Sequence, residues 1–150
     1  MIRTVTGIAY HSDVALVTVN NIPNTPKNLA KILGEMAKRQ VPVDMICRTA
    51  SYKKRFTLSF TVPKENLGDV ISATSAFKAL DSEISTDVNG NNIKVILSGR
   101  EMGSRYGVAW ELFTLLSEEN ISVKLITTAE TEISCLVDIK DLSQVKKLLN

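Results

Sequence analysis

The sequence Ile22-Pro23-Asn24-Thr25-Pro26-Lys27-Asn28-Leu29 joins a predicted strand to a predicted helix. Thr25 can cap this helix with its hydroxyl. Pro26 suits the first helical position, because its φ is fixed at a helical value and the N–H it lacks would be unpaired there. The start of a helix that follows a strand in this way can bind the carboxylate of a small ligand. The alternative is that the segment is only a tight connection between two elements.

The composition indicates a soluble globular chain. Its 150 residues are 44% hydrophobic, enough to bury one sizeable core or two small ones. No apolar run approaches the roughly 20 residues that cross a bilayer, and Met1 to Thr4 lack the apolar core of a signal peptide, so a cytoplasmic location is expected. Cys47 and Cys135 lie in apolar runs without CxxC spacing, which predicts buried free thiols rather than a disulfide or a metal site.

Charge and motifs exclude several classes of function. The 18 basic and 16 acidic residues are interspersed, and the one basic run, Lys53-Lys54-Arg55, falls in a predicted hairpin turn, so no nucleic-acid surface is expected. The single histidine, His11, has no second histidine to pair with as a metal ligand or proton relay. Motifs of serine hydrolases, P-loop nucleotide binding and zinc proteases are missing. The sequence therefore predicts no catalytic residue, no metal and no cofactor.

The first part of the chain has the pattern of one ferredoxin-like unit. From residue 14 the predicted order is strand, helix, two strands, helix and strand, which places two helices on one face of a four-stranded antiparallel sheet. Asn89-Gly90-Asn91-Asn92 predicts a turn and a domain boundary. The predicted strands are 5–10, 14–19, 43–49, 55–62 and 83–88, with polar turns at 11–13 and 51–54. The first predicted helix runs from Thr25 to about Gln40, and the second covers 65–80. The apolar residues of the second helix are Leu67, Val70, Ile71, Phe77 and Leu80.

The pattern then begins again, which indicates an internal repeat. Leu33 falls on Phe113 and Met36 on Leu116, at a constant offset of about 80 residues. The second copy is predicted to contain strands 93–98, 123–127 and 133–137 and helices 107–119 and 142–149.

The second copy lacks a fourth strand, while strand 5–10 belongs to no unit in the first copy. We therefore expect the N-terminal strand to complete the second sheet. The predicted domains are 13–89, inserted in the chain, and 1–12 together with 90–150. The predicted fold class is α+β, with two ferredoxin-like βαββαβ units.

Several phrases of the chain, taken in order, resemble the tandem ACT domains at the C-terminus of aspartokinase. They are Val5-Thr6-Gly7-Ile8-Ala9-Tyr10, Val43-Asp44-Met45-Ile46, Leu58-Ser59-Phe60-Thr61-Val62-Pro63, Gly107-Val108-Ala109, Leu125-Ile126-Thr127-Thr128-Ala129-Glu130 and Ile133-Ser134-Cys135-Leu136-Val137. The resemblance implies that the first unit is inserted in the second and that the pair binds threonine or lysine as a feedback inhibitor of aspartate phosphorylation. It also implies a homodimer, and a kinase domain on the N-terminal side. The chain is then expected to be a regulatory fragment or a separate small subunit.

The resemblance places a first effector site at the opening loop. Where the family usually has Asp-x-Pro-Gly, this chain has Asn24-Thr25-Pro26-Lys27, and where the family usually has Gln-Asn, it has Arg48-Thr49. These changes add positive charge, so a more acidic ligand, or none, is an alternative. The predicted residues are Asn24, Thr25, Pro26, Lys27, Asn28, Leu29, Arg48 and Thr49, joined across an interface by Asn120, Ile121, Ser122 and Val123.

A second possible effector loop lies at the matching place of the second copy. There the family usually has His-Pro-Gly and this chain has Arg105-Tyr106-Gly107. The predicted residues are Met102, Gly103, Ser104, Arg105, Tyr106, Gly107 and Val108. The alternative to an effector-binding module is a dimerisation module whose ligand site has decayed, with exposed edge strands available for pairing in either case. An independent enzyme is not supported, because the sequence offers no catalytic group.

Overall fold

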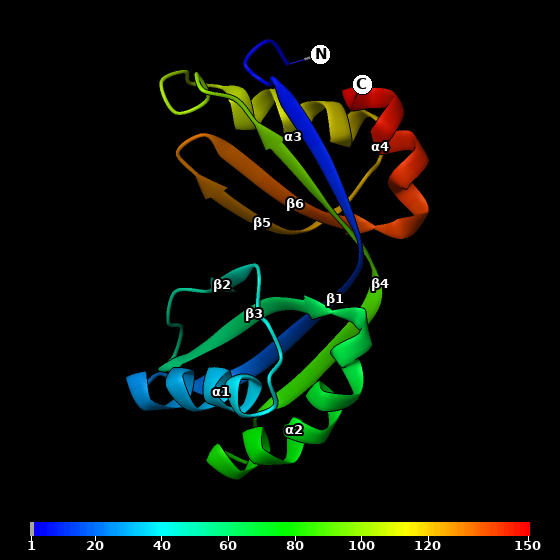
Figure 1. The fold of residues 1–150 in the computed structure, drawn as a ribbon. Helices are drawn as coiled ribbons and strands as arrows, with labels where there is room; N and C mark the ends of the chain where they lie inside the picture. The colour runs from blue at the N-terminus through cyan, green and yellow to red at the C-terminus, as the bar shows by residue number, and fades with distance from the viewer. Residues whose placement is uncertain (1) are drawn as a thin grey trace. The chain divides into compact units, whose positions relative to one another are not determined.

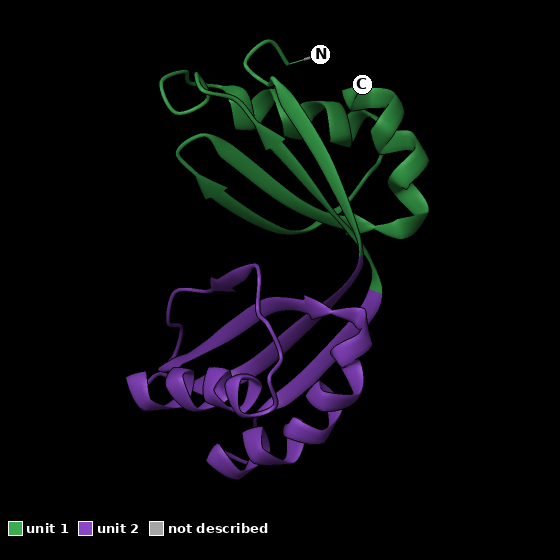
Figure 2. Ribbon diagram, viewed as in Figure 1, with its two compact units in different colours: residues 1–12, 91–150 green, residues 13–90 purple. Residues whose placement is uncertain are grey.

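A computed structural model describes residues 2–150, which divide into two compact units (Figure 2). Residues 13–90 form one unit, which we call the inserted unit. Residues up to 12 and residues 91–150 form the other, which we call the outer unit. The chain passes between the units twice, once within strand β1 (Gly7–Pro23) and once within strand β4 (Ser85–Ser98). Each unit therefore uses part of both long strands.

The inserted unit is a four-stranded sheet with two helices on one face (Figure 1). Its strand order is β2-β3-β1-β4, and β3 pairs antiparallel with both β1 and β2. Alternate residues of β1 and β3 are buried against the helices, which is the period-two pattern of a half-covered sheet. The remaining elements of this unit are α1 (Pro26–Lys38), β2 (Ile46–Arg48), β3 (Arg55–Pro63), a short 3-10 turn (Lys64–Asn66) and α2 (Leu67–Leu80).

The outer unit repeats this plan with the strand order β1-β4-β6-β5. Its core contains Val95, Leu97, Leu112 and Cys135, which come from β4, α3 and β6. The elements are α3 (Val108–Glu118), β5 (Val123–Ala129), β6 (Glu132–Asp138), a 3-10 turn (Ile139–Asp141) and α4 (Leu142–Leu149). The predicted fold class, α+β with ferredoxin-like units, is confirmed.

Two predicted turns are wrong. Residues 11–13 lie within β1, and residues 89–92 lie within β4. Both stretches are where the chain leaves one unit for the other, and the side chains of His11, Ser12 and Asp13 are exposed. Exposed polar residues outside a hydrophobic core have the composition of a turn. The backbone can nevertheless continue as a strand through them when adjacent strands pair with it. Predicted strand 43–49 also shortens to β2, Ile46–Arg48.

Burial corrects two further predictions. Cys47 is exposed on edge strand β2, because a three-residue strand at the sheet edge has no neighbour on its outer side, whereas Cys135 is buried as predicted. Both thiols are free, and burial raises the pKa of Cys135 to about 12. Ile71 is exposed, since α2 buries Val70, Ala73 and Phe77 instead.

None of the helices formed by residues 2–150 is long and apolar enough to span a membrane. Over the same residues, the structure holds no group of three or more His, Cys, Asp or Glu side chains that could bind a metal ion.

Candidate functional site

The opening loop begins helix α1 with the predicted cap. Thr25 has extended backbone angles, and its Oγ1 accepts a hydrogen bond from the Asn28 backbone N–H at 3.3 Å. Pro26 is the first helical residue. The cap occupies one of the N–H groups that a helix start leaves without an intrahelical partner. The sequence-based prediction of this helix start is confirmed.

The opening loop is fastened to the structure on both sides. The Asn24 backbone N–H donates to the Lys54 carbonyl at 2.9 Å, which ties the loop to the tip of the β2–β3 connection. The Asn28 side-chain amide donates to the Pro23 carbonyl at 3.0 Å. Both bonds commit polar groups of the loop to partners within the chain.

Arg48 lies against the same loop. Its Nη2 donates to Asn24 Oδ1 at 3.3 Å, and its Nε donates to the Thr49 carbonyl at 3.0 Å. Its guanidinium carbon lies 3.9 Å from the centre of the Phe56 ring, within the range of a cation–π contact. The structure thus brings together Asn24, Arg48 and Thr49, which the sequence had predicted to share a site.

The hydroxyl of Thr49 is also used within the chain. Thr49 Oγ1 accepts from the Thr57 backbone N–H at 3.0 Å, and the Thr49 N–H donates to the Thr57 carbonyl at 2.9 Å. Lys27 and Arg48 bring positive charge to the loop, and neither forms an ion pair with an acidic side chain among residues 2–150. The loop therefore combines two positively charged side chains with polar groups that are already hydrogen-bonded within the chain.

The second predicted loop, 102–108, follows strand β4 and precedes helix α3. Its first part is a compact turn in which Met102 donates its N–H to the Gly99 carbonyl and Ser104 Oγ donates to the Glu101 carbonyl. Gly103 has no room for a side chain, because a Cβ there would lie 2.6 Å from the Glu130 carbonyl oxygen. Arg105 Nε lies 3.8 Å from Glu101 Oε2.

Helix α3 starts without a side-chain cap. Gly107 stands at the cap position with φ of 87°, a left-handed conformation that glycine adopts readily. Tyr106 is 100% exposed and Trp110 is 71% exposed, so both aromatic rings stand in solvent at the first turn of the helix. The second loop thus has two exposed aromatic side chains beside it, whereas residues 24–29 of the first loop contain none.

A surface pocket of about 400 Å³ adjoins the second loop. Its walls carry both signs of charge, from Arg3, Arg105 and Glu111. They also include Thr4, whose buried Oγ1 has no hydrogen-bond partner among residues 2–150. The full lining is Arg3, Thr4, Arg105, Tyr106, Val108 and Glu111. The sequence predicted the loop residues but missed Arg3, Thr4 and Glu111, because only the completed sheet of the outer unit brings the N-terminal residues to helix α3.

The last predicted group, 120–123, belongs to the outer unit. Asn120 has a left-handed φ of 56°, Ile121 is buried, and β5 begins only at Val123. These residues therefore form the turn from α3 into β5 rather than a strand over their whole length. Their predicted contribution to the first site stays a prediction.

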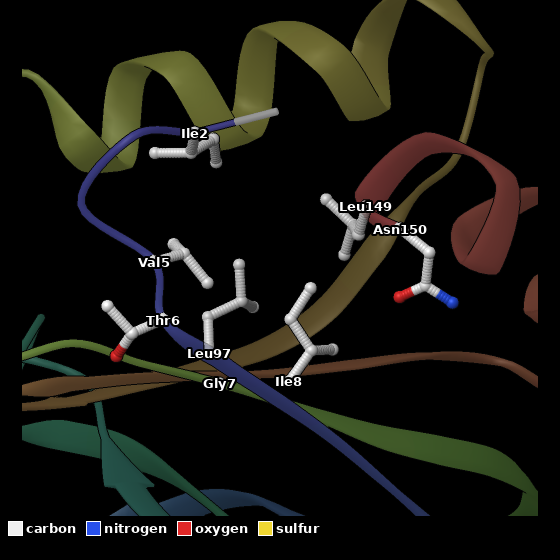
Figure 3. Close-up of a pocket in the computed structure, with 8 residues that line it drawn as sticks. All are labelled: Ile2, Val5, Thr6, Gly7, Ile8, Leu97, Leu149 and Asn150. Atoms are coloured by element: carbon white, nitrogen blue, oxygen red, sulfur yellow. The ribbon is translucent and has the colours of Figure 1, made fainter.

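A second cavity of the outer unit, of about 330 Å³, is mostly apolar (Figure 3). It lies between the N-terminal segment, strand β4 and the end of helix α4. Its lining is Ile2, Val5, Thr6, Gly7, Ile8, Leu97, Leu149 and Asn150. Among the residues that the structure describes, no charged side chain lines it, so these residues offer little to the ammonium and carboxylate groups of an amino acid.

Comparison with known proteins gives consistent results. Residues 95–150 match the family model of the ACT domain. The aspartokinase of Helicobacter pylori is 35% identical over 136 residues, which cover 91% of this chain and 33% of that protein. The chain spans about a third of the length of the curated relatives it matches.

Two solved structures match this chain along nearly its full length. A chain of the structure described as aspartokinase alpha and beta subunits is 32% identical, with a TM-score of 0.86 over 97% of this chain and 95% of that one. The ligand-free regulatory subunit of aspartate kinase from Thermus thermophilus is 25% identical, with the same TM-score and the same coverage of both chains.

Proposed function

The chain belongs to the family of ACT-domain regulatory regions of aspartokinases, and we propose that it is a non-catalytic module that senses an amino acid and thereby controls aspartate phosphorylation. The observation that carries this proposal is the match along almost all of both chains to a protein described as a regulatory subunit of aspartate kinase. A chain of this size and fold therefore exists elsewhere as a regulatory unit in its own right.

The proposed effector is an amino acid of the threonine or lysine class. The pocket beside the second loop supports this, because a zwitterion needs both signs of charge. Arg3 and Arg105 can bind its carboxylate, and Glu111 can bind its ammonium group. We propose residues Met102 to Val108 as the position of this effector. Asn24 to Leu29, with Arg48 and Thr49, are proposed as a second effector position, whose added positive charge favours a more acidic ligand.

The proposed mechanism is a shift between conformations of the regulatory region. An effector that binds one arrangement more tightly raises its population, and the attached or associated kinase responds. By linkage, substrates or kinase contacts that favour the other arrangement lower the affinity for the effector by the same factor. The proposed partners are an aspartokinase catalytic domain or subunit and a second copy of this chain, for which edge strands β2 and β5 are available. A cytoplasmic location stays a prediction.

Calorimetric titration of the chain with threonine, lysine and methionine tests the sensing function. We expect saturable binding of at least one of them, weakened at least about tenfold by Glu111→Gln, which removes the charge proposed to bind the ammonium group. Glu118→Gln, the same change at an exposed site in the last turn of α3, is the matched control and should leave affinity unchanged. Regulation is then tested by measuring aspartate phosphorylation with and without the bound effector. Absence of binding by all three amino acids contradicts the proposal.

The internal bonding of the first loop favours a second candidate, a dimerisation module without a ligand. Asn24, Thr25, Asn28 and Thr49 all direct polar groups to partners within the chain. Light scattering and thermal unfolding together distinguish the two candidates. A purely structural module should form a dimer whose mass, measured by light scattering, and thermal stability, measured by unfolding, do not respond to amino acids.

A further inference from the structure

We propose that Arg48 determines which ligands the inserted unit accepts, and that it closes the opening loop to ligands that present an ammonium group. The inference rests on the proposed function, because it concerns one of the two proposed effector positions. It concerns how that position selects ligands, which the family similarity does not specify.

Three contacts hold the Arg48 guanidinium at the loop. It donates to Asn24 Oδ1 at 3.3 Å and to the Thr49 carbonyl at 3.0 Å, and it stacks at 3.9 Å on Phe56, which is buried. The stack restricts the planar group to one side of the ring, and the two hydrogen bonds set its rotation. The cation is therefore held in place beside Asn24.

The loop has few acceptors left for an incoming ammonium group. The Thr25 and Thr49 hydroxyl oxygens already accept from backbone N–H groups, and the Pro23 carbonyl already accepts from the Asn28 side-chain amide. Asn24 Oδ1 is the acceptor that faces Arg48, and the guanidinium already bonds to it. A ligand ammonium would have to share this oxygen with a fixed cation.

Electrostatics act in the same direction. Arg48 and Lys27 are both positive, and neither forms an ion pair with an acidic side chain among residues 2–150. A second positive group placed beside Arg48 would be repelled most strongly where water is displaced, since the local dielectric constant falls there. The Arg48 guanidinium thus occupies the place beside Asn24 where the ammonium group of a ligand would bind.

Two substitutions test this by making the loop receptive. Arg48→Gln removes the cation, and Asn24→Asp in the same chain supplies a carboxylate that can accept an ammonium group. The probe is L-lysine, which carries two ammonium groups, and binding is followed by calorimetry and by amide chemical shifts of residues 24–29. We expect no lysine-dependent shift at this loop in the unmodified chain. The double variant should bind lysine there at least about tenfold more tightly.

Lys53→Gln is the matched control, because it removes one positive charge near the loop from a side chain that packs on Tyr52 and does not bond to Asn24. It should behave like the unmodified chain. Arg48→Gln alone, at an exposed position, should shift lysine affinity in the same direction by a smaller factor. It keeps the test valid if the double variant does not fold.

The inference is overturned if lysine binds the opening loop of the unmodified chain, or if the Arg48 variants gain nothing. It is also overturned if Lys53→Gln gains as much as Arg48→Gln. These outcomes are separate from failure of the proposed function, which appears as absence of effector binding to the unmodified chain at either loop. Lysine bound at residues 24–29 of the unmodified chain would support sensing while refuting the role of Arg48.

Discussion

The two strand-to-helix loops stand at equivalent places in the repeat, yet they begin their helices by different means. In the inserted unit, Thr25 caps α1 with a side-chain hydrogen bond, and Arg48 donates a hydrogen bond to Asn24 of the loop. In the outer unit, Gly107 supplies a left-handed backbone without a cap, and Tyr106 stands fully exposed beside a pocket of mixed charge. A repeated fold thus preserves the position of a loop without preserving the contacts that its side chains make.

This difference follows from where each loop's polar groups are directed. The first loop directs several of its donors and acceptors to partners within the chain, which stabilises it. The second loop leaves its helix start uncapped and its aromatic residues in water. We therefore expect loss of a side-chain contact in the first loop to lower stability, and loss of an exposed side chain of the second loop, such as Tyr106, to change stability little.

The largest expected effect comes from removing the aromatic ring beneath the first loop. Phe56→Ala deletes a buried side chain and the surface on which Arg48 stacks, and should lower the free energy of unfolding by about 3–5 kcal/mol. Tyr106→Ala, the matched aromatic deletion in the second loop, should change it by less than about 0.5 kcal/mol. Unit-resolved hydrogen exchange measures both, and equal effects of the two substitutions would contradict the comparison.

A smaller effect is expected at the start of α3. Gly107→Val places a β-branched side chain at a φ of 87° and should destabilise the outer unit by about 1–2 kcal/mol, because this backbone conformation crowds Cβ. The space around a Cβ at Gly107 is open, so the cost is expected from the backbone alone. Gly107→Asn is the control, since asparagine tolerates this conformation better. Urea unfolding should show the valine variant clearly less stable than the asparagine variant; equal values would exclude backbone strain as the cause.

The cap of α1 should contribute somewhat less. Thr25→Ala removes the acceptor for the Asn28 N–H and is expected to destabilise the inserted unit by about 1 kcal/mol. Thr25→Ser keeps the hydroxyl and should retain most of the stability. Faster exchange of the first-turn amides of α1 in the alanine variant, with α3 unchanged, would locate the effect. An unchanged midpoint of urea unfolding would show that the cap is dispensable.

Most of the fold was predictable because local and periodic signals agree. The Thr25-Pro26 pair marks a helix start through its own chemistry, and helix 142–149 was predicted with the bounds observed for α4. The strand conformation of residues 11–13 and 89–92 was not predicted, because their polar composition is that of a turn, whereas strands β1 and β4 continue through them. Strand continuity depends on pairing with distant residues, which no short window contains.

The site was predictable in part for the same reason. Its loops follow from strand–turn–helix chemistry, and the resemblance suggested that Asn24 and Arg48 share one place. The bond between these two side chains and the stack on Phe56 depend on the register of β2 against β3. Likewise, only the closed outer sheet brings Arg3 and Thr4 to the second loop. Contacts of this kind need the tertiary structure.

The smallest expected effect concerns the stability of each unit in acid. It depends on one aspartate in each unit, Asp81 in the inserted unit and Asp138 in the outer unit. Backbone donation from Glu83 and the Arg55 guanidinium hold the pKa of Asp81 below its usual value, and Arg55 follows Lys54, whose carbonyl binds Asn24. The Lys140 backbone N–H and then the Lys124 ammonium do the same for Asp138 in the outer unit.

Each carboxylate stabilises its unit above the unfolded-state pKa of about 3.9, and this contribution is lost as pH falls through the lower pKa of the folded state. Asp81→Asn should therefore be less stable than the unmodified chain at neutral pH, and the difference should vanish in acid. Asp138→Asn should show the same pH dependence in the outer unit. Only Asp81→Asn should speed amide exchange of Asn24 and Asn28, because Asp81 binds Arg55, which follows the residue whose carbonyl accepts from Asn24. Equal exchange at these amides in both variants would show that the first loop does not depend on this ion pair.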